Sequence, residues 1–540
     1  MTTVSPRDSS INGGVLPDAP VPEIDRSCVS RLAKAVEIAD YAAAEEIARD
    51  SWFDLALSLR HGVAEALEPI PANELRGRPL LLMMLGMAYN VTPQQRAKGL
   101  RYFVAAVFAA RSMRGRVRMT DRVLLLASES AAFRVIGRTG LSVRAARSAL
   151  GALEALPAVE RGSIPALPRI YAHLGTSLYY GGRVAEALSC FERGLAESPT
   201  QGYPLGFTNV AMLAGIHALA GDVHEAEAYL QSARGEPWTD VQRSWYSGTF
   251  YRIAEAIVAL ERFDTATARA HLDAMRHDRR TIEHWRAISA TEALVALVDG
   301  RAAAGLVGMD AFAKLRGEEG RRPATVSSLA GVRSLLQLAL GSTAAAATVL
   351  RSIDRGEAER YAGAARIALA RGEHGAALHD SRVAAERACS SRTLAEAAAI
   401  EAAATLRVEG SRRRRPAIEH LAELLLSTGM RLPVTMLPPA DYAAVCAELT
   451  RFGYDELRQE LPERPILTFD APEAVLTEAE LTVLDAMRRH PSITSIAGDL
   501  RLSVNTVKSH RRNIYRKLQV NTRDAAVAVG LDRQLLISTE

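Results

Sequence analysis

Residues 476–529 read LTEAELTVLDAMRRHPSITSIAGDLRLSVNTVKSHRRNIYRKLQVNTRDAAVAV, and this stretch near the carboxyl end decides the fold. Thr477 and Glu480 form the T-x-x-E pattern of a capping box, which begins a helix. Leu481, Leu484 and Met487 continue that helix at helical spacing until a proline interrupts it. A second short helix follows, and then a third helix capped by a serine. The stretch therefore predicts a small unit of three short helices and a fourth.

The third predicted helix, residues 504–518, has two different faces. At 100° per residue Ile514 and Leu518 each lie within about 20° of Val507, and the three form a buried stripe. Polar and basic residues take the opposite side: Asn505, Lys508, Ser509, Arg512 and Arg516. A cationic helix face is often just solvated, but here a capped helix and a tight turn precede it. The combination suits the major groove of DNA.

Two other residues of the tail have structural interpretations. Asn521 is placed to cap the fourth helix, with Asp524 near the positive end of that helix. His510 has no second histidine or cysteine at ligand spacing, so we expect a structural or backbone-contacting role and no metal site.

Several short motifs in the tail belong to one known pattern. L-T-x-x-E begins at Leu476, I-A-x-x-L at Ile496, S-x-x-T-V-K-x-H at Ser503, I-x-x-K-L-x-V at Ile514 and R-x-x-A-V at Arg523. In these motifs the tail resembles the LuxR-type (GerE-like) helix-turn-helix domain of bacterial transcription regulators. The resemblance covers residues 476–529 without a gap.

The resemblance implies a DNA-contacting set and a dimer. Lys508, Ser509 and Arg512 would approach bases, Thr506 and Lys517 would touch phosphates, and the last helix would mediate dimerisation. Together with the groove-facing residues of the third helix, the expected DNA-binding set is Ser503, Asn505, Thr506, Lys508, Ser509, Arg512, Arg516 and Lys517. The chain departs from the family at Ala479, where an arginine is usual, and at Ser495, where an acidic residue is usual.

Most of the remaining chain has the pattern of a helical repeat array. One pair of helices has the tetratricopeptide spacing of aromatic, Leu-Gly, large apolar, Ala, Phe, small and Pro residues. These residues are Tyr171, Leu174, Gly175, Leu178, Ala187, Phe191, Gly194 and Pro199, of which Pro199 is expected to end the second helix. Looser pairs are predicted at residues 79–110, 121–156, 210–233, 251–275, 284–315, 326–350, 357–383 and 393–425. Glycine turns such as Gly300, Gly341 and Gly372 separate the helices of later pairs.

The chain thus divides into four predicted parts within an all-α fold. Residues 1–28 form a disordered arm, residues 29–460 a tetratricopeptide-like helical solenoid, residues 461–474 a proline-rich, semi-extended linker, and residues 475–540 the four-helix LuxR-type helix-turn-helix domain. A proline cluster at residues 433–439 is expected to end the regular solenoid earlier.

Composition narrows the class of protein. The net charge is only +4 over 540 residues, so affinity for nucleic acid must come from a local patch. The four cysteines, Cys28, Cys190, Cys389 and Cys446, are scattered without a C-x-x-C, which favours a reducing cytoplasm. The most apolar run, residues 79–91, is too short to cross a bilayer. No P-loop, receiver domain or catalytic constellation is evident, so we expect no enzyme and no cofactor.

The leading hypothesis is a cytoplasmic, sequence-specific transcription regulator that binds double-stranded DNA as a homodimer. Its repeat array would sense a protein, peptide or small-molecule effector. The alternative is a helical-repeat interaction scaffold whose tail binds DNA only non-specifically, and an enzyme in the solenoid groove is a distant third. Salt titration separates the first two, because purely non-specific binding depends on salt but not on sequence.

Overall fold

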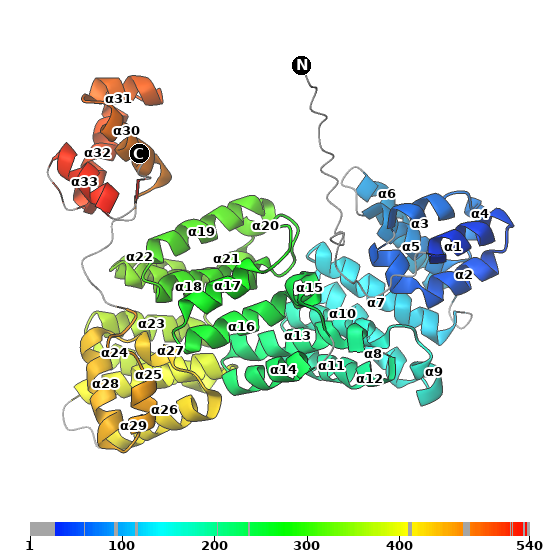
Figure 1. Ribbon diagram of the computed structural model, residues 1–540, viewed down its shortest axis with the longest axis horizontal. Coiled ribbons are helices and arrows are strands. Elements are labelled where there is room, and N and C mark those ends of the chain that lie inside the picture. Colours follow the sequence, from blue (N-terminus) through cyan, green and yellow to red (C-terminus); the bar gives the residue numbers. More distant parts are fainter. Residues whose placement is uncertain are drawn as a thin grey trace. The chain divides into compact units, whose positions relative to one another are not determined.

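A computed structural model describes most of the chain. It describes residues 27–58, 60–90, 95–113, 117–201, 203–235, 238–408, 413–467, 476–518, 520, 522–532 and 535–536. Over these residues the secondary structure is helical and no strand occurs, as the sequence predicts (Figure 1). The chain divides into two compact units, Met1–Ile216 with Ala228–Arg252, and His217–Glu227 with Ile253–Glu540. No helix among the described residues is both long and apolar enough to cross a membrane.

The first unit is a stack of helical pairs. It contains α1 (Ser27–Glu37), α2 (Tyr41–Asp50), α3 (Arg60–Leu67), α4 (Ala72–Leu75), α5 (Pro79–Asn90), α6 (Arg96–Ser112), α7 (Met119–Val135), α8 (Thr139–Glu154), α9 (Ala158–Gly162), α10 (Leu167–Tyr180), α11 (Val184–Ala196), α12 (Ser198–Gln201) and α15 (Asp240–Ser244). The pairs α5 with α6, α7 with α8 and α10 with α11 pack internally, and α7 also packs against α5 and α10. Each pair therefore buries its apolar face against the next, as in a solenoid.

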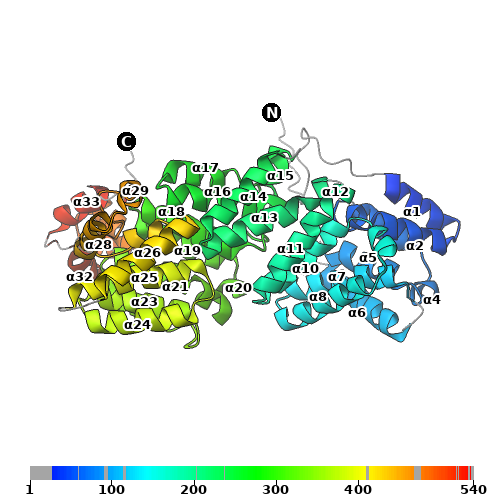
Figure 2. The same cartoon turned by 90° about the horizontal axis from the view of Figure 1, so that it is seen from below.

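Three helices contribute residues to both units: α13 (Tyr203–Ala220), α14 (Val223–Gly235) and α16 (Thr249–Glu261). The second unit continues with α17 (Thr265–Asp273), α18 (Trp285–Val298), α19 (Ala302–Leu315), α20 (Glu318–Arg321), α21 (Pro323–Ala339), α22 (Thr343–Leu350), α23 (Ala358–Ala370), α24 (His374–Arg387), α25 (Ser391–Arg407), α26 (Arg414–Thr428), α27 (Leu432–Thr435), α28 (Pro439–Arg451) and α29 (Asp455–Glu460). Consecutive pairs again stack, and α23, α24 and α25 lie side by side in both views (Figures 1 and 2).

The predicted helical pairs and glycine turns are confirmed. Gly300, Gly341 and Gly372 each connect two paired helices with φ between 72° and 75°. A residue with a side chain is strained in this left-handed conformation, so glycine is favoured at these turns. The named tetratricopeptide family remains a prediction, because the observed geometry is that of helical pairs in general.

The pair of α10 and α11 shows why small residues are needed at a helix crossing. Phe191 is fully buried, and a Cβ atom added to Gly175 would lie 2.6 Å from the Cε1 atom of its ring. The predicted close approach at Gly175 is therefore present. Pro199 does not end the second helix, because α11 stops at Ala196 and Pro199 lies within α12.

We expect Gly175→Ala to destabilise the first unit by about 1–3 kcal/mol, because a methyl group there overpacks the crossing against Phe191. Hydrogen exchange of α10 in the full-length chain measures the effect. Gly151→Ala is the matched control, since a Cβ atom at this position in α8 meets nothing within 4 Å. Alanine there should be neutral or slightly stabilising. Equal exchange rates in the two variants would contradict the prediction.

The array does not end at the proline cluster of residues 433–439, which corrects the prediction. Pro433 lies in the first turn of α27, and Pro439 is the first residue of α28. Both helices pack against α25. Proline is tolerated in a first turn because its missing N–H has no helical partner there. Helical packing therefore continues to the end of α29.

A buried carboxylate holds the start of α27. Glu261, at the end of α16, is 2% exposed and accepts hydrogen bonds from the backbone N–H groups of Arg431 (2.7 Å) and Leu432 (2.9 Å). Arg392 of α25 also donates to Glu261 at 3.1 Å. These bonds satisfy N–H groups at a helix start that have no intrahelical partner. They fix α27 against α16 and α25.

The predicted linker is partly packed. Residues 461–467 lie against α27 and α28, with Leu461 4% and Leu467 0% exposed. The backbone N–H of Ile466 donates to the carbonyl of Thr435 at 2.8 Å. This corrects the expectation of a semi-extended tether for residues 461–467, while residues 468–475 lie outside the described part. The predicted arm falls almost wholly on residues 1–26, which also lie outside it, although Ser27 and Cys28 already belong to α1.

Candidate nucleic-acid interface

The carboxyl-terminal residues form a small helical domain with its own core. It comprises α30 (Glu478–Arg489), α31 (Ile493–Leu500), α32 (Val504–Leu518) and α33 (Arg523–Asp532), and α30 packs against each of the other three. The buried residues are Leu476, Val483, Leu484, Ala486, Met487, Ile496, Ala497, Val507, Ile514, Leu518, Ala526 and Leu536. All of them come from residues 476–536, so this domain buries a hydrophobic cluster of its own.

Reciprocal caps begin the first two helices. Thr477 and Glu480 form the predicted capping box of α30, with the N–H of Glu480 3.2 Å from the Thr477 hydroxyl and the N–H of Thr477 2.8 Å from the Glu480 carboxylate. A second capping box, between Ser492 and Ser495, begins α31, and the sequence pattern did not predict it. Its S-x-x-S pattern is a weaker signal than S-x-x-E. Ser495, which departs from the family pattern, therefore acts as a cap.

A tight turn connects α31 to α32. Arg501 takes a left-handed conformation with φ 54°, and the N–H of Leu502 donates to the carbonyl of Ala497 at 3.0 Å. The Ser503 hydroxyl then accepts from the N–H of Thr506 at 3.0 Å, as the predicted cap. A non-glycine residue at positive φ is uncommon and must be held by its surroundings. The turn thus sets the direction in which α32 leaves α31.

The two faces of α32 agree with the helical-wheel prediction. Val507 and Ile514 are fully buried and Leu518 is 2% exposed. On the opposite face Asn505, Lys508, Ser509 and Arg512 are all exposed. Neither Lys508 nor Arg512 lies in an ion pair with any residue that the structure describes. The side chain of Arg516 is outside the described part, so its predicted place on this face stays a prediction.

The other members of the predicted set do not all share this face. Ser503 is exposed but its hydroxyl is engaged in capping, and the hydroxyl of half-buried Thr506 lies 2.7 Å from it. Lys517 turns toward the core, where its Nζ atom lies 2.5 Å from the Glu480 carboxylate. The side chain of Glu480 is 4% exposed and that of Lys517 29% exposed. Lys517 therefore joins α32 to α30, and its contact with a phosphate stays a prediction.

The pKa of Glu480 reflects this pairing. Burial by itself raises the pKa of the carboxyl group, but the hydrogen bonds from Lys517 and from the Thr477 N–H outweigh burial and lower it below 4.5. The folded state therefore favours the charged carboxylate. The contribution to stability is complete above about pH 4.5 and is lost as pH falls through the lowered pKa.

The last helix begins with a side-chain cap. The Thr522 hydroxyl accepts from the N–H of Ala525 at 3.2 Å at the start of α33, and Asn521, the predicted cap, lies outside the described residues. Arg523 donates from Nε to the Met487 carbonyl at 2.8 Å, near the end of α30. A cation at the carbonyl end of a helix complements the helix dipole. This bond and buried Ala526 hold α33 against α30.

We expect Lys517→Met to destabilise a fragment of residues 470–540 by about 1–3 kcal/mol near pH 7, because a nearly buried carboxylate loses its cation. Urea unfolding followed by circular dichroism measures the change. Arg512→Met is the matched control, since it removes an exposed cation from the same helix and should change stability by less than about 0.5 kcal/mol.

The difference in free energy of unfolding between Lys517→Met and Arg512→Met should depend on pH. It should shrink as pH falls through the lowered pKa of Glu480, because a protonated, neutral carboxyl group is no longer stabilised by a nearby cation. Equal stability of Lys517→Met and Arg512→Met near pH 7 would show that the pair is energetically neutral.

Comparison with known proteins agrees with this geometry. Residues 474–529 match the family described as bacterial regulatory proteins, luxR family. Nitrate/nitrite response regulator protein NarP of Escherichia coli (strain K12) is 40% identical over 81 residues, which is 15% of this chain and 38% of NarP. Transcriptional regulatory protein YdfI of Bacillus subtilis (strain 168) is 41% identical over 64 residues, which is 12% of this chain and 30% of YdfI.

These matches define the class of the tail. Residues 474–529 form a LuxR-type helix-turn-helix domain, a domain of bacterial transcription regulators. The chain spans well under half the length of both relatives. The similarity therefore bears on the tail and leaves the array to be interpreted from its own residues.

Proposed function

We propose that the chain is a sequence-specific, DNA-binding transcription regulator in which α32 lies in the major groove. The observation that carries the proposal is the exposed face of α32, where Asn505, Lys508, Ser509 and Arg512 lie opposite the buried stripe. This face runs for about 10 Å along the helix. It matches a groove about 12 Å wide, and arginine, lysine and asparagine side chains pair well with base edges there.

The remaining members of the DNA-binding set take supporting roles in this proposal. Ser503 and Thr506 lie at the start of α32, where a phosphate would be favoured because a helix N-terminus attracts anions. Arg516 is predicted from the helical wheel to extend the same face toward the carboxyl end. Lys517 acts mainly by fixing α32 to α30. A homodimer through α33 would place two such helices on two half-sites one helical turn apart.

The array is proposed as the sensory part of the regulator. Its stacked helical pairs resemble arrays that bind proteins, peptides or small molecules along one face. Residues 468–475 join it to the DNA-binding domain in the chain. An effector that changes the state of the array's last helices can therefore act on the tail through a short connection.

Genome-wide mapping of DNA sites bound by the full-length protein tests the proposal. Discrete sites with a shared motif and paired half-sites are expected. Binding that is equal on all sequences, with only a steep salt dependence, would instead support a scaffold that binds DNA non-specifically.

A further inference from the structure

Residues 461–467, which we call the strap, close one side of a pocket at the end of the array. The Tyr442 hydroxyl donates to the carbonyl of Pro462, and Arg458 donates from Nη1 to the carbonyl of Leu461 at 3.1 Å. The rest of the strap is held by two further interactions. The side chains of Leu461 and Leu467 are buried, and the backbone N–H of Ile466 donates to the carbonyl of Thr435. The strap is thus attached to α27, α28 and α29 by a few separate contacts.

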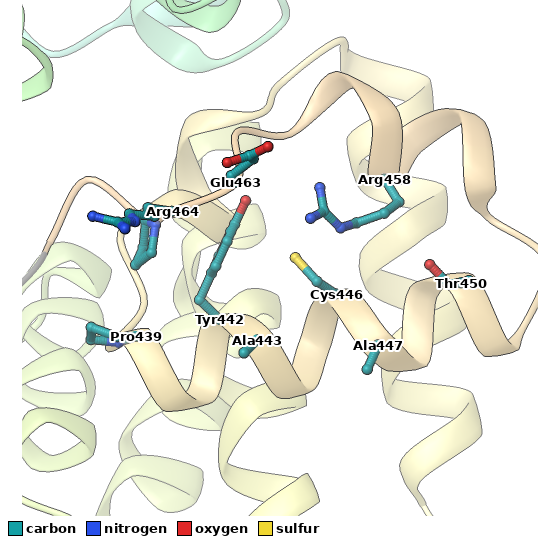
Figure 3. Close-up of a pocket in the computed structure, with 10 residues that line it drawn as sticks. Pro439, Tyr442, Ala443, Cys446, Ala447, Thr450, Arg458, Glu463 and Arg464 are labelled. Carbon is teal, nitrogen blue, oxygen red and sulfur yellow. The ribbon is translucent and has the colours of Figure 1, made fainter.

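The pocket lies between α28, α29 and the strap, and has a volume of about 550 Å³ (Figure 3). This volume is in the range of small-molecule sites. One complete stripe of α28 forms its floor: Pro439, Tyr442, Ala443, Cys446, Ala447 and Thr450. Arg458 of α29 and the strap residues Glu463, Arg464 and Pro465 form the opposite wall.

The floor of the pocket is largely apolar, and the opposite wall carries two arginines, Arg458 and Arg464, and one glutamate, Glu463. Alanine and proline side chains supply the apolar surface. In Figure 3 the guanidinium of Arg458 lies on the same side of α28 as the Cys446 sulfur and points into the space between α29 and Tyr442. No carboxylate that the structure describes lies within ion-pair distance of Arg458. A cation without a carboxylate partner beside an apolar wall can recognise an amphipathic anion.

The two titratable groups on α28 leave this positive charge intact. Burial raises the pKa of the Cys446 thiol and that of the Tyr442 hydroxyl. Both groups are therefore neutral near pH 7, and neither competes with an anion for Arg458. Arg458, Arg464 and Glu463 together give the pocket one net positive charge.

We propose that this pocket binds a small carboxylate with an unbranched apolar body, and that the bound ligand holds the strap in place. The carboxylate pairs with Arg458, and the apolar body lies along Ala443, Ala447 and Pro465. Because three strap residues line the pocket, the ligand favours the docked strap over any state in which the strap has left α28.

The consequence for regulation rests on the proposed function of the tail. The strap is followed after eight residues by the first residues of the DNA-binding domain, so its docking limits to eight the residues between the packed array and the domain. The ligand therefore controls how far the DNA-binding domain can move away from the array. Binding of the ligand itself requires neither DNA nor the tail.

Calorimetry of the full-length chain with hexanoate and octanoate, without DNA, tests the pocket. We expect binding that is about tenfold or more weaker in Arg458→Gln, which loses the charged hydrogen bonds. Ala447→Phe, at an exposed position of α28, should abolish binding by filling the pocket. Arg451→Gln is the control for the loss of an arginine. Arg451 lies at the end of α28, outside the pocket, and this variant should bind the carboxylates like the unaltered chain.

Two results would overturn the assignment of the pocket. One is the absence of binding by both carboxylates, and the other is equal binding by the unaltered chain, Arg458→Gln and Ala447→Phe. If hexanol binds as tightly as hexanoate, the ligand of the pocket is not recognised through a carboxylate.

Cleavage by a glutamate-specific protease after Glu463, an exposed strap residue, tests the coupling. At a ligand concentration of about ten times Kd, cleavage should slow about tenfold, because the protease needs an undocked strap. Binding without slower cleavage would overturn the coupling. Specific DNA binding is measured separately, so its loss bears on the proposed function and not on the pocket.

Discussion

Lys508→Ala and Arg512→Ala are each expected to weaken specific DNA binding by about 1–3 kcal/mol, or roughly 5- to 150-fold. Both side chains are exposed on the side of α32 opposite the buried stripe, and neither lies in an ion pair with a described residue. Replacement by alanine therefore breaks no ion pair with the described residues of the domain. The loss should depend on the operator, because a side chain that reads a base contributes mainly at its cognate site.

Fluorescence anisotropy with the full-length protein measures these affinities at one fixed salt concentration, on an operator and on a scrambled duplex. Lys314→Ala is the matched control, since this exposed lysine lies on α19 of the array, and its removal should leave affinity unchanged. If both α32 variants bind the operator like the unaltered protein, α32 is not the recognition helix. Equal losses on both duplexes would indicate phosphate contacts instead of base contacts.

The tail could be predicted in detail because local rules determine its helices. The capping box of Thr477 and Glu480, the serine cap before α32 and the spacing of Val507, Ile514 and Leu518 all act within one or two helical turns. Sequence patterns report such short-range interactions directly. The bounds of α32 were accordingly predicted to the residue.

Lys517 shows where this local reasoning stops. On a helical wheel it lies at the flank of the buried stripe, and its motif suggests a phosphate contact. In the fold it pairs with Glu480, which is 37 residues away in the sequence. A helical wheel represents the residues of one helix, here α32, whereas the buried carboxylate of Glu480 belongs to α30. The tertiary contact therefore gives this lysine a structural role that the pattern of α32 alone does not contain.

Prolines were the least informative residues of the array. Proline ends helices, but it is also favoured in their first turn, so Pro433 and Pro439 are compatible with either role.

The strap has the composition of a free linker because only a few of its side chains are buried. Leu461 and Leu467 anchor it to surfaces that exist only once α27 and α28 are packed.

Ile514→Ala is expected to have the largest effect on the stability of the DNA-binding domain. Ile514 is fully buried in a cluster drawn only from residues 476–536. Truncation of such a side chain costs about 2–5 kcal/mol, from lost burial and from the cavity that remains. A domain of this size is stable by only about 3–5 kcal/mol. The fragment of residues 470–540 should therefore be largely unfolded at 25 °C, as measured by urea unfolding and circular dichroism.

Ser509→Ala separates stability from recognition on the same helix. Ser509 is exposed, so its replacement should change the free energy of unfolding by less than about 0.5 kcal/mol. Ile514→Ala should lose DNA binding together with its cooperative unfolding transition, whereas Lys508→Ala should lose affinity while the transition stays in place. If the free energy of unfolding of the Ile514→Ala fragment lies within about 1 kcal/mol of that of the unaltered fragment, the packing of α32 does not depend on the buried stripe. The groove-facing side of α32 would then lack the fixed orientation on which specific recognition depends.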